Sequence, residues 1–245
     1  MQPNKLLQLL RDNARAEAPQ PLRIEASAGS TDIYVNDVID ANWGVGAAAL
    51  ITALASADGK DVVMHINSPG GDVFEARAMA AAIVAHPGKV TAQIDGCCAS
   101  AATYLALACN EVRMTDGALF MVHNSWTMAM GDKNDLIETA DLLDKIDGAI
   151  TNDYVNKTGA SAETVKGWMD ATTWFTAAEA LDAKLIDAID SNTKAKPKKM
   201  AQWNLAAYPN APKATEPAPE PDALLAEKVA AQIQTNRNRM RLFRI

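Results

Sequence analysis

The stretch INSPGGDVFEARAMAAAI, residues 66–83, decides how this chain folds. It begins with the end of a strand-like run, breaks at Pro69, Gly70 and Gly71, and continues at once into an alanine-rich segment of helical composition. A strand, a tight turn and a helix in direct succession form the repeating unit of α/β proteins. The glycine pair also offers unobstructed backbone N–H groups, which suit an oxyanion hole or a phosphate-binding turn. The GxGxxG and GxxxxGK phosphate motifs are both missing.

The same alternation of strands and helices continues on both sides of this stretch. Strands are expected over 31–39, 61–68 and 89–96, helices over 44–57 and 74–86 and from about Ser100, and two short strands around the Asp116–Gly117 turn. Apolar residues recur every three or four positions over 132–157, which predicts one long amphipathic helix. Further helices are expected at 161–170 and 176–185, followed by a strand at 186–189. This order predicts an α/β fold with mostly parallel strand pairing.

Composition divides the chain into three parts. The sequence has 245 residues with a 49% apolar share, enough for one sizeable core. We expect an N-terminal segment over 1–22, one main domain over 23–192, and a proline-rich linker with a basic tail over 193–245. Residues 193–245 carry 10 Lys/Arg and 4 Asp/Glu, whereas residues 1–192 carry 13 basic and 26 acidic side chains. A basic tail therefore follows an acidic body.

Several classes of protein do not fit the sequence. No apolar run approaches the roughly 20 residues that span a bilayer. The three cysteines include an adjacent pair but no CxxC motif, which suits a reducing compartment better than a disulfide or zinc framework. We therefore expect a cytoplasmic protein with no metal and no cofactor, and nothing in the sequence establishes a nucleic-acid or membrane partner.

Residues capable of chemistry follow three neighbouring strands. Ligands gather at the carboxyl ends of parallel strands, and here those ends carry residues 68–71, residues 96–100 and His123. Ser100 is a nucleophile or an ordinary helix N-cap, since serine favours both positions. His123 is its candidate base, because His65 lies inside a strand and His86 closes a helix beside a proline.

The motifs INSPGGDV, GCCASAATYLAL and MVHN together resemble the Clp protease proteolytic subunit, over residues 33–189. The resemblance implies a Ser-His-Asp serine peptidase on the spiral ββα fold shared with crotonases. It also implies a handle-like long helix through which rings of subunits pair, and hence a homo-oligomer that acts on protein and peptide substrates.

The resemblance also implies the site residues. Ser100 would be the nucleophile and His123 the general base. The acid would be Asp170, the only carboxylate in the approach to the matching segment WFTAAEALDAKLID. The backbone N–H groups of Gly71 and Ala101 would receive the oxyanion. Gly70 and Asn124 would contact the substrate.

Departures from the housekeeping pattern favour one branch of the family. The interval from Ser100 to His123 is two residues shorter, Lys184 replaces a glycine, and the segment after His123 lacks the glutamine- and glycine-rich run. With its WFTAAEA form, the chain resembles the head-maturation (prohead) proteases of tailed phages and prophages. We therefore expect an endopeptidase that processes capsid and scaffold proteins, in the host cytoplasm or in assembling proheads, with a tail that tethers it or is itself cleaved.

Alternatives remain open at this point. The chain could be a housekeeping-type subunit that works with an ATP-dependent unfoldase, or a crotonase-fold acyl-CoA enzyme that uses Asp72 and Glu75 as acid and base. It could also be a non-catalytic shell protein, or use a Ser-Lys dyad. Cys98 is an alternative nucleophile.

Overall fold

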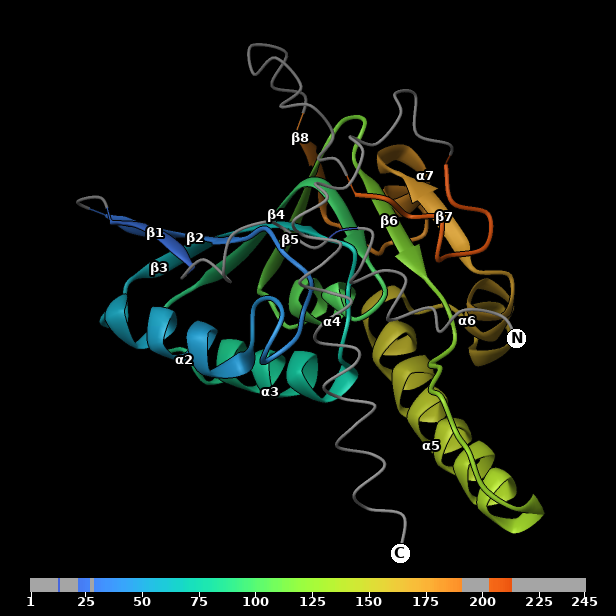
Figure 1. Ribbon diagram of the computed structural model, residues 1–245. Helices are drawn as coiled ribbons and strands as arrows, with labels where there is room; N and C mark the ends of the chain where they lie inside the picture. Colours follow the sequence, from blue (N-terminus) through green and yellow to red (C-terminus); the bar gives the residue numbers. More distant parts are fainter. Residues whose placement is uncertain (1–12, 14–21, 27–28, 191–202, 213–245) are drawn as a thin grey trace, which may run out of the picture.

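The computed structural model describes residues 13, 22–26, 29–190 and 203–212 (Figure 1). The tail beyond 212 and nearly all of the N-terminal segment, with the predictions made for them, lie outside this part of the chain. In chain order the elements are β1 (Arg23–Ala26), β2 (Ser30–Val35), α2 (Ala47–Ser56), β3 (Asp61–Ser68), α3 (Val73–Ala85), β4 (Val90–Ala99), α4 (Ala102–Leu107), β5 (Glu111–Thr115), β6 (Leu119–Val122), α5 (Lys133–Thr158), α6 (Ala162–Asp170), β7 (Thr173–Thr176), α7 (Ala177–Asp182) and β8 (Ala188–Asp190).

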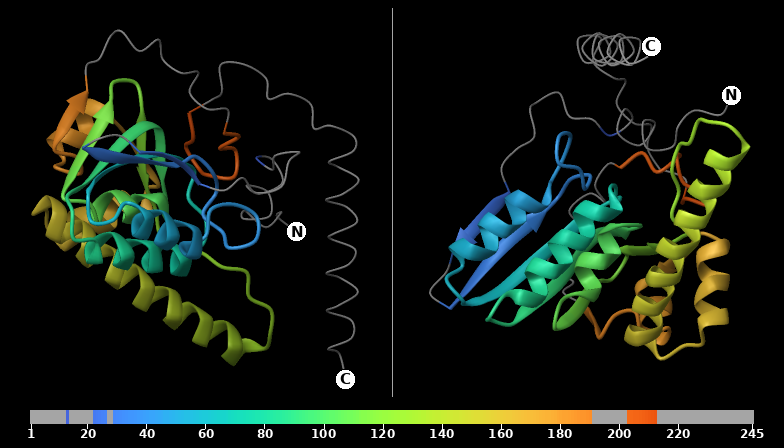
Figure 2. Two further views of the ribbon diagram at one scale, coloured as in Figure 1. Left: turned by 90° about the vertical axis from the view of Figure 1, so that its left-hand side faces the viewer. Right: turned by 90° about the horizontal axis from the view of Figure 1, so that it is seen from below.

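The strands form one sheet with a parallel centre. Its main path runs β1-β2-β3-β4-β5-β8, and only β1 on β2 and β7 on β6 pair antiparallel. The helices α2 and α3 lie side by side under one face (Figures 1 and 2). Strand residues that face the core alternate with residues that do not, and fully buried side chains include Ile33, Met64, Ile66, Ile94, Met114 and Phe120. The expected α/β architecture with mostly parallel pairing is confirmed.

The ten-residue strand β4 organises the carboxyl end of the sheet. On one side it pairs with β5 through Thr91–Ile94 and then with β6 through Cys97–Ala99. Strands β5 and β6 flank the expected Asp116–Gly117 turn but pair with β4 rather than with each other. On its other side the register with β3 shifts after Ile66, so that Ser68 lies opposite Cys98. The ends of β3, β4 and β6 thus meet in one place.

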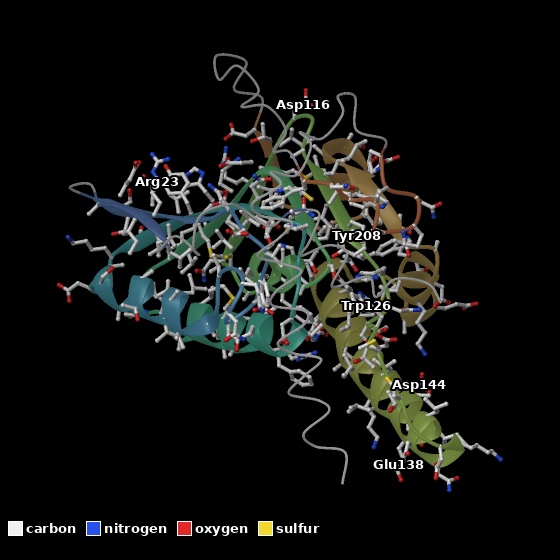
Figure 3. The ribbon with its side chains drawn as sticks, viewed as in Figure 1. Arg23, Asp116, Trp126, Glu138, Asp144 and Tyr208 are labelled. Carbon is white, nitrogen blue, oxygen red and sulfur yellow. The ribbon has the colours of Figure 1, made fainter. Side chains whose placement is uncertain are left out.

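The helix ends follow local chemistry. Asp72 caps α3, because its side chain accepts hydrogen bonds from the N–H groups of Phe74 and Glu75. Asp132 and Asp135 form a capping box at the start of α5, which ends at Gly159 in the left-handed conformation. The helix α5 projects away from the sheet and carries Glu138 and Asp144 on its protruding half (Figure 3).

The sequence did not indicate β1 and β7, and it placed the end of β4 three residues early. The structure also differs within the segment expected to be linker. Residues 203–212 pack against the domain, where Trp203, Ala207 and Tyr208 join Val38, Cys97, Ala99 and Met121 in a second apolar cluster. The two large aromatic side chains, Trp203 and Tyr208, give this stretch apolar area to bury against the domain. The domain boundaries drawn from composition stay predictions.

Candidate active site

Ser100 occupies a strained turn between β4 and α4. Its φ is +55°, which is uncommon for a residue other than glycine. Its N–H donates to the Met121 carbonyl of β6 at 2.9 Å, and its own carbonyl accepts from Thr103. The N-cap of α4 is Ala101, without a side-chain cap. The Ser100 hydroxyl therefore does not cap the helix, which removes the plainest structural explanation for this serine.

His123 follows directly after β6. Because β6 runs parallel to the last residues of β4, His123 and Ser100 leave adjacent strands at the same end of the sheet. The Ser100 Oγ and His123 Nε2 atoms are 2.6 Å apart. This is the distance at which an imidazole can take the proton of an attacking hydroxyl.

The glycine turn packs directly on the nucleophile. A Cβ at Gly70 would lie 2.5 Å from the Ala99 carbonyl oxygen and 2.7 Å from the Cβ of Ser100. A Cβ at Gly71 would lie 2.1 Å from the Ile39 carbonyl oxygen. Both glycines have positive φ, +91° and +152°. The turn therefore needs glycine for close approach as well as for conformation.

The backbone polar groups of the glycine turn divide into those bonded to Ile39 and those without an acceptor among the described residues. The Gly70 carbonyl accepts from Ile39 N, and Asp72 N donates to Ile39 O, so these two groups face the Ile39 loop. Within the described part of the chain, the Gly71 and Ala101 N–H groups have no hydrogen-bond acceptor. Both residues line the same cavity as Ser100 and His123. Two backbone donors thus lie beside the nucleophile, as an oxyanion site requires.

A cavity of about 320 Å³ opens on this face of the site. Its far wall is the face of α5 that the sequence pattern predicted to be apolar. The apolar lining side chains include Phe74, Met128, Leu142, Leu143, Ile146 and Ile150. The buried Ser125 Oγ also lies at this cavity and has no hydrogen-bond partner among the described residues. Its position two residues after His123 was the only signal for it in the sequence.

Asp170 and Asn124 come together beside the histidine's segment. Asp170 is the last residue of α6 and is exposed, and its Oδ1 accepts a hydrogen bond of 2.7 Å from Asn124 Nδ2. Asn124 directly follows His123 in the chain. The structure therefore brings Asp170 to the residue next to the expected base. Its place in a triad stays a prediction.

The other candidates lie in settings that do not favour chemistry. Cys98 is fully buried, and burial raises the pKa of its thiol well above the usual value, so the thiolate nucleophile is disfavoured. Asp72 caps α3, and Glu75 accepts a hydrogen bond from Ala47 N at 2.7 Å, so both carboxylates serve structure. His86 closes α3 and contacts the Lys60 carbonyl. Among the described residues, no group of His, Cys, Asp and Glu is arranged to hold a metal ion.

Sequence reasoning missed Tyr208. This residue lies in the segment expected to be linker, yet its hydroxyl donates to the Pro69 carbonyl at 2.6 Å and its ring meets that of His123. The signal that could have indicated it is a tryptophan and a tyrosine five residues apart in an otherwise proline-spaced stretch.

No helix of the described residues has the length and apolar character to cross a membrane.

Comparison with known proteins gives a consistent result. The sequence model of the Clp protease family matches residues 25–193. The ATP-dependent Clp protease proteolytic subunit 1 of Protochlamydia amoebophila is 30% identical over 174 residues, 68% of this chain and 84% of that protein. Subunit 1 of Chlamydia abortus is 33% identical over 135 residues, 54% of this chain and 70% of its own length. Subunit 3 of Rhodococcus jostii is 28% identical over 163 residues, 65% of this chain and 81% of its length.

Proposed function

This chain belongs to the Clp protease family of serine peptidases, and from that premise we propose that it is an endopeptidase in which Ser100 is the nucleophile and His123 the general base. The observation that carries the proposal is the 2.6 Å contact between Ser100 Oγ and His123 Nε2, beside two backbone N–H groups that have no acceptor among the described residues. The mixed sheet and the long projecting helix agree with the Clp protease and crotonase type of fold.

The reaction proceeds in two halves. Ser100 Oγ attacks the carbonyl carbon of the scissile peptide while its proton passes to His123 Nε2. The negative charge that develops on the carbonyl oxygen is stabilised by the N–H groups of Gly71 and Ala101. His123 then gives the proton to the departing amine, which leaves an ester on Ser100. A water molecule that loses a proton to His123 hydrolyses this ester and regenerates the hydroxyl.

The geometry also indicates how a substrate would lie. Gly70 O and Asp72 N are held by Ile39, so the turn's remaining donor and acceptor belong to Gly71. An extended peptide would therefore pair with Gly71 rather than with Gly70 and direct one side chain into the cavity. The apolar wall along α5 favours an apolar side chain there. Ser125 supplies a buried polar group in this cavity, whereas the Asn124 amide is bound to Asp170.

Asp170 is the proposed acid of the site. Its charge-assisted hydrogen bond to Asn124 holds the segment that carries His123, and through this segment the carboxylate would orient the base. Because this carboxylate is exposed, its contribution is expected to be smaller than those of Ser100 and His123.

The relatives guide the biological setting. Their names describe ATP-dependent proteases, which favours a proteolytic subunit that works with an ATP-dependent unfoldase. They lend no support to the head-maturation branch expected from the departures near Ser100 and Lys184. Exposed apolar residues on and beside α5, among them Met128, Met130, Leu136 and Ile137, support assembly into a homo-oligomer through this helix.

One experiment tests the proposed function and separates the two settings. The purified chain is incubated with an unfolded protein, with a folded protein plus a Clp-type ATPase and ATP, and with capsid and scaffold proteins, and the products are identified by mass spectrometry. Cleavage that is lost in Ser100→Ala is expected in the first two arms. Specific cuts confined to capsid or scaffold proteins would favour head maturation, and equal products from Ser100→Ala would refute the peptidase assignment.

A further inference from the structure

Residues 203–212 are fixed to the end of the sheet that carries the active site. Trp203 Nε1 donates to the side chain of Asn67 at 3.2 Å, and Trp174 Nε1 donates to the Pro209 carbonyl at 3.3 Å. Asn210 Nδ2 donates to the Ala171 carbonyl at 3.0 Å. These anchors come from β3, β7 and the end of α6, so the segment joins three elements that surround the site.

Tyr208 is the residue of this segment that reaches the reacting groups. Its side chain is buried, with 6% of the residue exposed. The phenol donates a hydrogen bond of 2.6 Å to the Pro69 carbonyl, directly before the two glycines of the turn. Its ring meets the His123 ring edge-on, with centroids 5.3 Å apart and planes at 76°. One side chain thus touches the turn and the base.

The phenol is a neutral donor under ordinary conditions. Burial raises the pKa of Tyr208 well above its usual value. A neutral phenol in an apolar cluster of Cys97, Ala99 and Met121 must keep a hydrogen-bond partner, because an unpaired one would be costly there. The bond to Pro69 O therefore fixes the turn and the tyrosine together.

Tyr208 lies next to the active site without lining its cavity. Ser100, His123, Gly71 and Ala101 all line the cavity, whereas Tyr208 is not among the described residues that do. The Ser100–His123 contact of 2.6 Å is intact with the tyrosine in place. Tyr208 therefore contacts His123 without filling the space proposed for the substrate. Figure 3 shows Tyr208 by β6 and β7, whereas Trp126, which lines the cavity, lies closer to α5.

We propose that Tyr208 is a positioning residue for the reaction of Ser100, an inference that rests on the function proposed above. Its hydroxyl holds the Pro69 carbonyl so that the following turn presents Gly71 N–H to the oxyanion. Its ring packs edge-on against His123 and keeps the imidazole in one orientation. The segment 203–212 thus contributes a residue to the active site.

The test compares Tyr208→Phe, Tyr208→Leu and Trp203→Phe in the full chain. A fluorophosphonate measures the rate of covalent attack by Ser100, p-nitrophenyl acetate hydrolysis gives kcat and KM, and thermal unfolding confirms that each variant is folded. Trp203→Phe is the matched control, because it removes a different anchor of the same segment, the hydrogen bond to the Asn67 side chain.

We expect Tyr208→Phe to lower the labelling rate and kcat about tenfold, the effect of roughly one lost hydrogen bond, with KM within about twofold. Tyr208→Leu, which also loses the ring contact, should lower the labelling rate and kcat about 100-fold. In Trp203→Phe, both rates should stay within about twofold of the wild type. Near-wild-type rates in both folded Tyr208 variants, or an equal loss in Trp203→Phe, would overturn the inference. A wild-type chain that does not label at Ser100 would instead refute the proposed function, and this inference with it.

Discussion

Two histidines of this chain contact polar side chains at the same sheet, yet only one lies at a strand end beside a cavity. His123 Nε2 is 2.6 Å from Ser100 Oγ, and His65 Nδ1 is 3.0 Å from Asp95 Oδ2. His65 even has a second carboxylate, that of Asp32, at 3.9 Å. It lies in the middle of β3, where its ring stacks on Tyr34 with centroids 4.5 Å apart. Judged by its partners alone, His65 would be the better triad histidine.

The difference lies in the backbone around each histidine. Strand β3 pairs with β2 on one side and β4 on the other, so the N–H groups near His65 are committed to the sheet. Beyond the ends of β3 and β4, the N–H groups of Gly71 and Ala101 have no acceptor in the described part of the chain and lie beside a cavity. Reactivity at this sheet therefore depends on a strand end that leaves donors for a developing charge.

Removal of the nucleophile should have the largest effect. Ser100→Ala is expected to lower kcat by roughly 10⁴-fold or more, because the covalent route is lost. The fold should be retained, since the hydroxyl caps no helix and the backbone bonds of residue 100 remain. Peptide hydrolysis and thermal unfolding, measured on the same preparation, check both statements. Full activity in the pure variant would show that another residue attacks.

Exchange of each histidine separates the two regions directly. His123→Ala should lower kcat by roughly 10³-fold or more, whereas His65→Ala should stay within about threefold of the wild type. The comparison is matched, because each substitution removes one imidazole with a polar partner from the same sheet. Steady-state hydrolysis by the two variants is the measurement. A larger loss for His65→Ala would mean that the carboxylate-rich face of the sheet, and not the strand ends, holds the chemistry.

The glycine turn gives a steric test of the strand end. Gly70→Ala would place a Cβ against Ala99 O and Ser100 Cβ, so we expect it to destabilise the fold by about 1–3 kcal/mol and to displace the nucleophile. Gly148→Ala is the control, because a Cβ there meets nothing and alanine favours the α5 helix by about 1 kcal/mol. Denaturant unfolding and labelling of Ser100 compare the variants. Unchanged stability and labelling in Gly70→Ala would contradict the close packing.

Among these four tests, the substitution of Asp170, the proposed acid, should have the smallest effect. Asp170→Asn removes the charge from the bond to Asn124, and we expect about a tenfold loss of kcat, the effect of roughly one charge-assisted hydrogen bond.

The control for Asp170 is Asp187→Asn. Asp187 accepts from Val112 N and Lys157 Nζ, so its loss should cost about 1 kcal/mol of stability without changing kcat per folded site. If Asp170→Asn has wild-type kcat, another group orients His123.

Much of the fold and the reacting pair could be predicted from the sequence. Strand β3 was bounded correctly, because alternating apolar residues end at a Pro-Gly-Gly turn. The proximity of Ser100 and His123 followed from the convergence of parallel strand ends. The apolar pattern of α5 predicted the helix but not the different surroundings of its two halves. Leu143, Ile146 and Ile150 line the cavity. Leu136 and Ile137 are exposed.

The features that sequence reasoning missed depend on pairing between distant segments. Strand β7 is only four residues long and exists because Thr173–Thr176 meets β6. The last residues of β4 are strand because β6 supplies them with a partner. Tyr208 reaches Pro69 across 139 positions of sequence, and no local pattern encodes that contact. Each of these features is fixed by tertiary packing rather than by periodicity.

The most direct test of the central claim is to locate the site of covalent modification. The wild-type chain is treated with a fluorophosphonate, digested, and analysed by tandem mass spectrometry, alongside His123→Ala and His65→Ala. We expect one adduct in the wild type, on Ser100. This adduct should be absent from His123→Ala and present in His65→Ala. An adduct on any other residue, or equal labelling of Ser100 in His123→Ala, would contradict it.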